Sequence, residues 1–282
     1  MVKMKLCTFV DHDGTERVGL VKDKKIYQLS GYKDMIELIQ NYSTEKIECD
    51  LKEAKNVYAF EEVDFMAPVT NPRKMIFVGF NYRDHIKESE STIPDYPVLF
   101  PKFNNSLIGN NQNVIIPRVV KKCDYEAELA FIIGKTAKNV DIDDAIEYVF
   151  GYTICNDVSA RDLQLRVSQW LSGKAIDTFA PMGPVIVTAD EIEDPHNLEI
   201  FCKINGELRQ KSNTGELIFN IPFLLSYISK TITLEPGDII STGTPQGVIL
   251  GSKDQVWLKE GDVCEIEIEN IGVLRNVFIN EK

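Results

Sequence analysis

Two carboxylates interrupt the start of an apolar run, where charged side chains are least expected. Residues 123–134 read CDYEAELAFIIG, with Glu126 and Glu128 two positions apart. Side chains two apart in a strand point to the same face, roughly 7 Å from each other. Two ionised carboxylates at that distance repel by about 2 kcal/mol at an effective dielectric of about 20. Either water covers this face, or a positive group lies between the two glutamates.

A third acid, Asp157, follows the apolar run VFGYTIC. It either caps the turn that continues through SARD or joins Glu126 and Glu128. If the three converge from two strands, they form a set of hard oxygen ligands of the kind that Mg²⁺ or Mn²⁺ accepts. Such a set is too rich in oxygen for a typical zinc site. Both interpretations of Asp157 fit these residues alone.

The segment VGFNYRDHIKES, residues 78–89, contains a histidine and a glutamate three positions apart, His85 and Glu88. That spacing is one turn if the segment is helical. A histidine hydrogen-bonded to a glutamate is oriented and made more basic, which suits a general base that activates water. The alternative is a surface helical turn with a chance pair.

Two glycine-containing segments present further polar groups. In GKAIDTFAPMGP, residues 173–184, Lys174 is either a surface lysine or a group that stabilises a developing enolate oxygen. In DIISTGTPQGV, residues 238–248, the Thr244 hydroxyl and nearby backbone N–H groups either bind a carboxylate or form a simple Gly/Pro turn.

The elements that must position these residues are mostly short strands. A meander of hairpins is expected before residue 30, a helix over 34–42 and a second helix over 219–230, and Asn205-Gly206 predicts a tight hairpin. Further strands are predicted at 74–80, 113–116, 126–133, 149–156, 184–188, 198–204, 207–211, 238–242, 263–269 and 273–279. After the proline-containing stretch APVTNPRK comes a fully apolar strand-like run, KMIFVGF, and the rest of the sequence is rich in strands with few long helices. This change predicts a small domain at 1–70 and a β-rich domain at 71–282.

Composition narrows the class of protein. The 282 residues carry a net charge of −12, which argues against nucleic acid as a partner, and no apolar run approaches the ~18 residues of a membrane span. Six scattered cysteines indicate buried thiols in a reducing compartment, and the N-terminus turns polar too soon for a secretory signal, so a cytoplasmic location is expected.

The sequence lacks the motifs GxGxxG, GxxxxGK[ST], GxSxG and HExxH, so it gives no signal for a dinucleotide fold, a P-loop, an α/β-hydrolase or a zincin. His12 and His196 fall in turns, where solvent exposure is expected.

Taken in order, five segments resemble the fumarylacetoacetate hydrolase superfamily, from about residue 70 to the C-terminus. They are GFNYRDHIKE, DYEAELAFIIGKTAKNV, GYTICNDVSARDLQ, GKAIDTFAPMGP and STGTPQGV. The resemblance implies an α+β, β-rich fold with a mixed β-roll or sandwich-like catalytic domain, preceded by a small N-terminal α+β domain, in a homodimer. It implies one Mg²⁺ or Mn²⁺ per subunit, held by Glu126, Glu128 and Asp157.

The resemblance also implies roles for the remaining polar residues. His85 and Glu88 correspond to a water-activating pair on a lid, and Lys174 to a catalytic and substrate-binding lysine. Arg161, Gln164 and Thr244 correspond to substrate contacts, and Arg161 and Lys174 would offset the negative charge of the substrate.

Substrates in this superfamily are small 2-oxo or β-diketo acids, so three hypotheses follow. The preferred one is metal-dependent cleavage of a C–C bond through an enolate, either acylpyruvate hydrolysis, in which His85 and Glu88 activate water, or oxaloacetate decarboxylation. The second is isomerisation of a hydroxymuconate or 2-hydroxyhepta-2,4-diene-1,7-dioate type of diacid. The third is a non-catalytic relative that binds small molecules. Neither nucleic acid nor membrane is expected as a partner.

Overall fold

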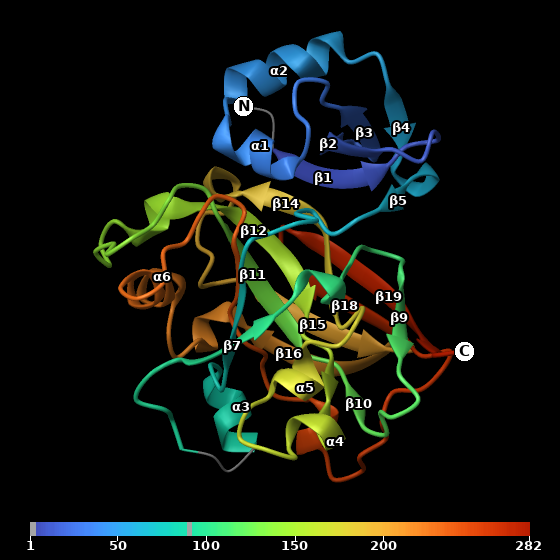
Figure 1. Cartoon of the computed structure of the whole chain (residues 1–282), viewed down its shortest axis with the longest axis vertical. Helices are drawn as coiled ribbons and strands as arrows, with labels where there is room; N and C mark the ends of the chain where they lie inside the picture. Colours follow the sequence, from blue (N-terminus) through green and yellow to red (C-terminus); the bar gives the residue numbers. More distant parts are fainter. Residues whose placement is uncertain (1–3, 89–91) are drawn as a thin grey trace.

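The computed structural model describes residues 4–88 and 92–282, and arranges them as a small N-terminal unit above a larger β-rich body (Figure 1). Residues 1–3 of the expected N-terminal domain, and Ser89 at the end of the segment that contains His85, lie outside the described residues.

The described residues contain one large mixed sheet that runs through both units. Its order is β4-β3-β2-β1-β14-β12-β11-β17-β6-β7, with β5 paired to β1 and β8 paired to β14. Most pairs are antiparallel, whereas β17–β6 and β14–β8 are parallel. The strands are β1 (Lys5–Val10), β2 (Glu16–Lys22), β3 (Lys25–Gln28), β4 (Val57–Ala59), β5 (Asp64–Phe65), β6 (Met75–Gly79), β7 (Val98–Lys102), β8 (Leu107–Ile108), β11 (Ala127–Ile133), β12 (Val149–Asn156), β14 (Ala180–Thr188) and β17 (Ile239–Ser241).

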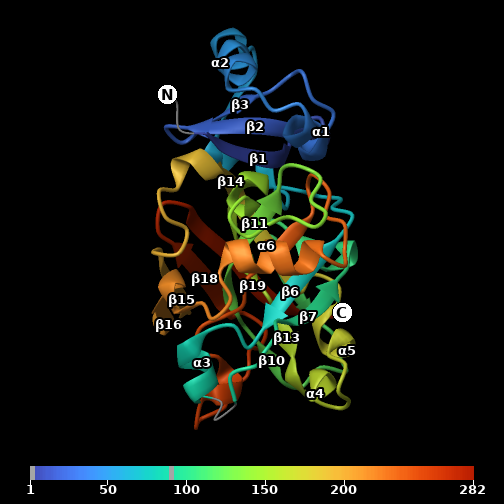
Figure 2. The same ribbon diagram turned by 90° about the vertical axis from the view of Figure 1, so that its left-hand side faces the viewer.

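A second sheet of the described chain, in the order β16-β15-β18-β19-β9, contacts β11, β12 and β14 (Figure 2). Its strands are β9 (Asn113–Ile116), β15 (Glu199–Ile204), β16 (Glu207–Asn213), β18 (Val263–Ile268) and β19 (Gly272–Asn280), and a short separate pair is formed by β10 (Cys123–Asp124) and β13 (Ser159–Ala160). The predicted hairpin joins β15 to β16, with φ of +53° at Asn205 and +81° at Gly206.

The helices are short, and their ends follow local capping. They are α1 (Met35–Gln40), α2 (Thr44–Glu53), α3 (Arg83–Glu88), α4 (Arg161–Gln164), α5 (Leu171–Lys174) and α6 (Ile221–Ser229). The Asp34 carboxylate caps α1 by accepting from Glu37 N at 2.8 Å, and the Asn220 side chain caps α6 by accepting from Phe223 N at 3.0 Å. No helix in the described part of the chain is long and apolar enough to span a membrane. The β-rich, mixed-sheet fold expected from the sequence is confirmed.

The alternation of side chains along strand β11 determines which face Glu128 lies on. Leu129, Phe131 and Ile133 belong to the core layer that includes residues of β15, β18 and β19. Ala130 and Ile132 belong to the other layer, with Phe77 of β6 and Phe100 of β7. Because side chains alternate along a strand, Glu128 lies on the same face as Ala130 and Ile132, away from the second sheet.

Candidate active and metal site

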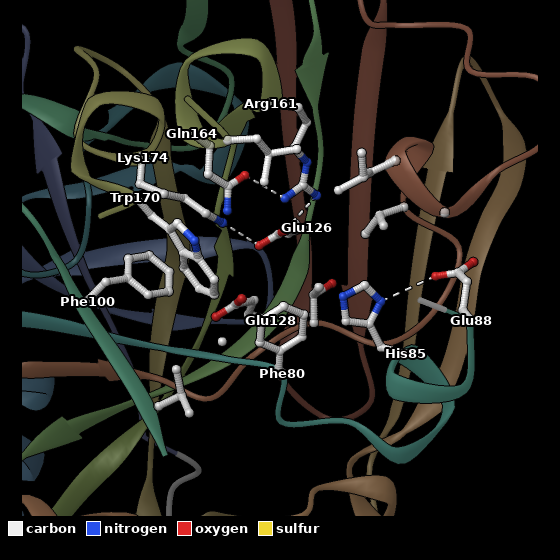
Figure 3. A pocket seen from close by; sticks show the side chains of 17 residues that line it. Phe80, His85, Glu88, Phe100, Glu126, Glu128, Arg161, Gln164, Trp170 and Lys174 are labelled. Atoms are coloured by element: carbon white, nitrogen blue, oxygen red, sulfur yellow. Dashed lines mark hydrogen bonds and ion pairs between the residues drawn. The ribbon is translucent and has the colours of Figure 1, made fainter. Parts of the chain in front are cut away.

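A cavity of about 370 Å³ opens at the end of β11 that carries the glutamates (Figure 3). Its lining contains eight of the nine residues singled out in the sequence, namely His85, Glu88, Glu126, Glu128, Arg161, Gln164, Lys174 and Thr244. The ninth, Asp157, is fully buried next to Glu126. The structure therefore brings the whole predicted set together, while the role of each residue stays a prediction.

The three acids meet because β11 and β12 run antiparallel, so that the start of one lies beside the end of the other. Ala127 pairs with Asn156, and Asp157 N donates to Glu126 O at 2.9 Å. One carboxylate oxygen from each of Glu126, Glu128 and Asp157 lies within 4.8 Å of the other two. The exposed fractions of these residues are only 6, 1 and 0%, which excludes a water-covered strand face.

Buried cations surround the acids. Lys174 Nζ lies 2.7 Å from Glu126 Oε2 and 2.5 Å from Asp157 Oδ2, and Arg161 Nη2 lies 2.6 Å from Glu126 Oε1. Lys102 Nζ contacts Asp157 Oδ1 at 2.6 Å from the opposite side. Lys174 is thus not a surface lysine, and Asp157 is held by two ammonium groups rather than serving as a helix cap.

The pKa values of the two glutamates shift in opposite directions. Burial alone would raise the pKa of Glu126, but Lys174 and Arg161 reverse this and lower the pKa to about 2. Burial raises the pKa of Glu128 well above its usual value, and the charges of Asp157 and Glu126 add to the increase. Glu128 is therefore the member of the triad that most lacks positive charge.

The donor set fits a hard divalent cation. Glu128 Oε2 accepts from Ser241 Oγ at 2.5 Å and from Gly243 N at 3.1 Å, whereas no donor of the described residues reaches Oε1. Three carboxylates without a histidine or cysteine ligand suit Mg²⁺ or Mn²⁺ better than Zn²⁺.

The charge balance gives a second reason for this fit. The buried cluster contains four carboxylates and three cations, namely Asp124, Glu126, Glu128 and Asp157 with Lys102, Arg161 and Lys174. With every group ionised, its formal charge is −1. A divalent cation would change the sign of that charge, which favours an anionic substrate.

The His85 side chain lies across the cavity from this cluster, on α3 (Figure 3). His85 Nδ1 is 3.3 Å from Glu88 Oε2, and Glu88 Oε1 accepts from Gly247 N at 3.0 Å. Glu88 is thus fixed from both sides. When Nδ1 carries the proton and donates to Glu88, Nε2 is left as an acceptor for a proton.

Three aromatic side chains, Phe80, Phe100 and Trp170, line the cavity beside its charged groups. Trp170 contacts Phe80 and Phe100 edge to face, with ring centroids 5.4 and 5.3 Å apart, and Phe80 stacks on His85 at 6.3 Å. Gly79 makes room for this packing, because a Cβ there would lie 2.4 Å from the Trp170 ring. These rings give the cavity an apolar surface next to His85.

The predicted substrate contacts have partners within the protein. Arg161 Nη1 donates to Gln164 Oε1 at 3.0 Å, and the Thr244 hydroxyl accepts from Gln210 Nε2 at 2.9 Å. Some of the Arg161 N–H groups therefore already donate hydrogen bonds to neighbouring side chains. The Thr244 hydroxyl still has a proton to donate.

Sequence reasoning missed three residues of the site. Lys102 and Asp124 are fully buried partners of Asp157 and Arg161, and Ser241 donates to Glu128. A signal existed for Lys102, a lysine that directly follows the apolar residues VLFP, and for Asp124, which directly precedes the YEAEL segment. Ser241 gave none, because serine is common at strand ends.

Two smaller predictions about polar residues are corrected. His12 is exposed as expected, but His196 is only partly exposed, because its Nε2 accepts from Ile221 N at 3.1 Å. Five cysteines are buried as expected, whereas Cys49 on α2 is exposed.

Comparison with known proteins agrees with this geometry. Residues 74–279 match the family model of the fumarylacetoacetate (FAA) hydrolase C-terminal domain. The mitochondrial oxaloacetate tautomerase of Xenopus laevis is 41% identical over 290 residues, covering 99% of this chain and 91% of that protein.

Two solved structures share the fold over nearly the whole chain. The fumarylacetoacetate hydrolase of Exiguobacterium antarcticum has a TM-score of 0.88 and 38% identity, covering 99% of this chain and 100% of that one. The maleylpyruvate hydrolase of Sphingobium sp. SYK-6, solved with manganese(II) and pyruvate, has a TM-score of 0.83 and 31% identity, with coverage of 99% and 100%.

The comparisons overturn the expected cytoplasmic location. The Xenopus relative and oxaloacetate tautomerases of rat and human that also match are named as mitochondrial. The polar N-terminus argues against a secretory signal, but it has no bearing on mitochondrial import. The fold, the buried acidic site and the match over most of the sequence establish that this chain is an enzyme of the fumarylacetoacetate hydrolase family.

Proposed function

We propose that this enzyme interconverts the keto and enol forms of a small 2-oxo dicarboxylic acid of the oxaloacetate type. The observation that carries the proposal is the position of the His85–Glu88 pair opposite a buried cluster of cations and carboxylates in a single cavity of about 370 Å³. A cavity of that size suits a small acid. The similarity to the Xenopus oxaloacetate tautomerase supports the same substrate.

One proton transfer is assigned to His85. With Nδ1 held by Glu88, its Nε2 accepts a proton from the carbon between the keto group and the distal carboxylate. The electrons of that C–H bond form the C=C bond, and the keto oxygen becomes negative. Return of the proton from the imidazolium to that oxygen gives the enol, and the reverse sequence gives the keto acid.

Lys174 acts as a fixed cation and not as the base. Burial alone would lower its pKa, but Asp157 and Glu126 reverse this and raise the pKa, so the ammonium keeps its proton. Together with Arg161 it offsets the negative charge of a dicarboxylate.

The residues that would hold a divalent cation are Glu126, Glu128 and Asp157, with one Mg²⁺ or Mn²⁺ per subunit. Bound there, the cation would supply a Lewis acid that stabilises negative charge on the keto oxygen. Gln164 and Thr244 line the same cavity and are proposed to orient the substrate carboxylates.

We further propose that residues 1–70 form a separate small domain and that the enzyme is a homodimer. Size-exclusion chromatography with light scattering would test the homodimer.

Cleavage of a C–C bond in an acylpyruvate or in oxaloacetate is the second candidate. For an acylpyruvate, the His85–Glu88 pair would remove a proton from water, and the hydroxide would add to the distal carbonyl. The C–C bond would then break to give a carboxylic acid and the enolate of pyruvate, which takes the proton back from the imidazolium. Oxaloacetate would instead lose CO2 without an attacking water. The neighbour named as a maleylpyruvate hydrolase, which holds manganese(II) and pyruvate, favours this alternative.

A single set of assays separates the two candidates. Freshly dissolved enol-oxaloacetate is mixed with enzyme and Mg²⁺ or Mn²⁺, the loss of enol absorbance is followed in the ultraviolet, and pyruvate is measured by proton NMR. Faster loss of enol without pyruvate, relative to metal alone, supports the tautomerase. Pyruvate from oxaloacetate or acetylpyruvate supports cleavage, and no acceleration of either process contradicts both.

His85→Gln tests the assigned base. Glutamine keeps the size and polarity of the residue but cannot accept the proton, so the tautomerisation rate should fall about 100-fold while the thermal stability changes little. An unchanged rate would remove His85 from the mechanism.

A further inference from the structure

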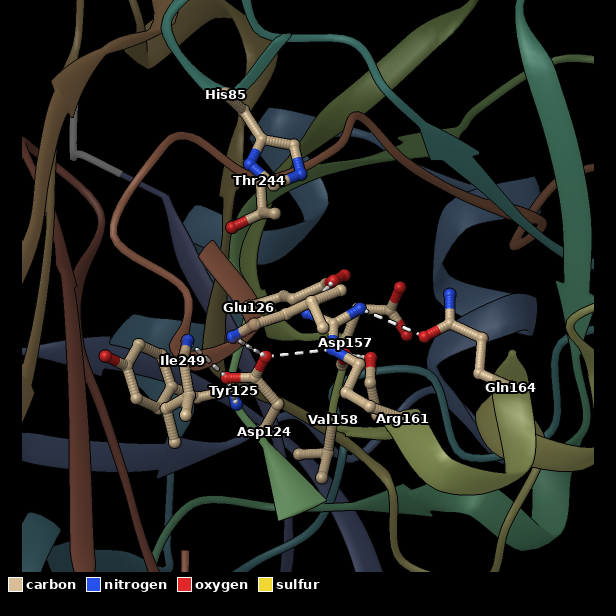
Figure 4. A network of polar contacts seen from close by, with 12 residues as sticks. His85, Asp124, Tyr125, Glu126, Asp157, Val158, Arg161, Gln164, Thr244 and Ile249 are labelled. Atoms are coloured by element: carbon tan, nitrogen blue, oxygen red, sulfur yellow. Dashed lines mark hydrogen bonds and ion pairs between the residues drawn. The ribbon is translucent and has the colours of Figure 1, made fainter. Parts of the chain in front are cut away.

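Asp124 is a fully buried carboxylate that the mechanism above does not use. It lies at the end of β10, and its two oxygens accept four hydrogen bonds (Figure 4). Oδ2 accepts from Arg161 Nε at 2.8 Å and from Leu250 N at 3.1 Å. Oδ1 accepts from Ile249 N at 2.8 Å and from Tyr125 N at 3.0 Å. One side chain thus joins a cation of the site to a distant part of the chain.

The first connection leads to the cation side of the cavity. Arg161 uses Nε for Asp124, Nη1 for Gln164 Oε1 and Nη2 for Glu126 Oε1, so the plane of its guanidinium is fixed from three directions. Of these partners only Asp124 lies outside the lining of the cavity. Asp124 therefore binds Arg161 from outside the cavity.

The second connection leads to the histidine side. Ile249 and Leu250 belong to residues 244–251, which we call the glutamate-binding loop. In this loop Gly247 N donates to Glu88 Oε1 at 3.0 Å, and a Cβ at Gly251 would lie 2.5 Å from Glu88 Cδ. The loop is therefore bonded to Asp124 at one end and supports Glu88, the partner of His85.

We infer that Asp124 is a positioning residue. Its carboxylate binds both Arg161 and the glutamate-binding loop, and so fixes their positions relative to each other. Replacing the carboxylate by an amide removes the negative charge beside Arg161 Nε, although Glu126 and Gln164 still contact the guanidinium, and it leaves at least one N–H group of the loop without its acceptor. Substrate binding through Arg161 and proton transfer through His85 should then weaken together. The kinetic part of this inference rests on the proposed function.

The test compares Asp124→Asn with a matched control, Asp238→Asn. Asp238 is also buried, accepts from the backbone N–H groups of Lys74 and Glu235, and pairs with Lys74 Nζ at 2.8 Å. It does not line the cavity. Asp124→Asn should raise KM for enol-oxaloacetate about tenfold or more and also lower kcat, whereas Asp238→Asn should reduce thermal stability with little change in either constant.

Two further measurements do not depend on turnover. Binding of oxalate, an unreactive dianion that resembles a 2-oxo acid, is followed by calorimetry in the presence of Mg²⁺, and should weaken about tenfold in Asp124→Asn. Amide hydrogen exchange should accelerate at Gly247, Ile249 and Leu250 in the same variant and stay unchanged in Asp238→Asn. If Asp124→Asn folds too poorly to assay, Asp124→Glu replaces it. The same results are expected, because the longer side chain keeps the charge but moves the carboxylate away from its place between Arg161 and the loop.

The outcomes distinguish this inference from the proposed function. A wild-type enzyme without tautomerase activity contradicts the proposed function, while oxalate binding and amide exchange still test the positioning role. If Asp124→Asn affects KM, oxalate binding and exchange in the loop no more than Asp238→Asn does, the inference is overturned.

Discussion

The Lys102 ammonium nitrogen lies 2.6 Å from Asp157 Oδ1, and neither side chain has any exposed surface. Lys102 also donates to the backbone carbonyls of Val158 at 2.9 Å and Phe179 at 2.5 Å, so all of its N–H groups have partners. Burial lowers the pKa of Lys102, and Asp157 opposes that change. This ion pair supports the end of β12, which carries one of the three acids.

Lys102→Met should destabilise the metal-free enzyme and strengthen its response to metal. Removing one partner of a buried ion pair costs about 3–5 kcal/mol, which lowers the melting temperature by roughly 10 °C. The remaining site is more negative, so Mg²⁺ should raise the melting temperature more than in the wild type. Lys253→Met, at an exposed position, is the control. An unchanged melting temperature, or a smaller effect of Mg²⁺, would contradict the expectation.

The metal assignment is tested by two glutamates with the same local spacing. Glu128 belongs to a buried pair at the cavity, whereas Glu267 of β18 lies two residues after Glu265 and is exposed. At a metal concentration about 100 times Kd, binding stabilises the folded state by about 2.7 kcal/mol. Glu128→Ala should abolish the rise in melting temperature with Mg²⁺ or Mn²⁺, and Glu267→Ala should preserve it. Loss of the shift in both variants, or in neither, would count against the triad.

Gly251→Ala should weaken catalysis through Glu88 alone. The added methyl would lie 2.5 Å from Glu88 Cδ, so the carboxylate must move away from His85 or from Gly247 N. We expect kcat to fall about tenfold with little loss of stability. Gly31→Ala is the matched control, because its methyl would approach the flexible end of Lys46 at 3.2 Å and Asp50 Oδ2 at 3.8 Å. Equal kcat values for the two variants would show that the position of Glu88 is unimportant.

His196 should make stability depend on pH. Burial lowers its pKa and Asp194 opposes that change, and the unprotonated Nε2 accepts a hydrogen bond from Ile221 N. Since the folded-state pKa lies below the usual value of about 6.5, this contribution is complete above that pH and is lost as the pH falls through the folded-state pKa. Melting curves from pH 8 to pH 5 should show the wild type losing stability relative to His196→Gln, by up to about 1 kcal/mol. A difference that does not vary with pH would refute the assignment.

The sequence could predict most strands and the candidate site, but not how the charges are paired. The pattern Glu-x-Glu occurs at Glu126 and Glu128 and again at Glu265 and Glu267, yet only the first pair is buried. Spacing alone cannot tell these cases apart, since burial depends on which sheets pack against the strand. The resemblance to a known family supplied the distinction.

Local patterns failed where contacts from distant residues decide the structure. The strand expected at 126–133 begins at Ala127, because Glu126 N donates to the side chain of Asn156 at 3.0 Å instead of to a backbone carbonyl of a neighbouring strand. Helix α2 was not predicted, because Ile47 is its single buried residue and no apolar stripe marks it. Lys102 escaped notice because its partner, Asp157, is 55 residues away in the sequence.

The pairing of β1 with β14 has a consequence for any attempt to shorten this enzyme. Lys5 and Leu6 pair with Val187 and Ile186, so the N-terminal unit covers one side of β14, which lies next to β12. Removal of residues before 70 would expose unpaired backbone groups on a strand that is buried along its whole length, and such an edge recruits strands from other molecules. A truncated catalytic domain is therefore expected to aggregate even if its chemistry is intact, so the N-terminal unit acts as a safeguard for solubility.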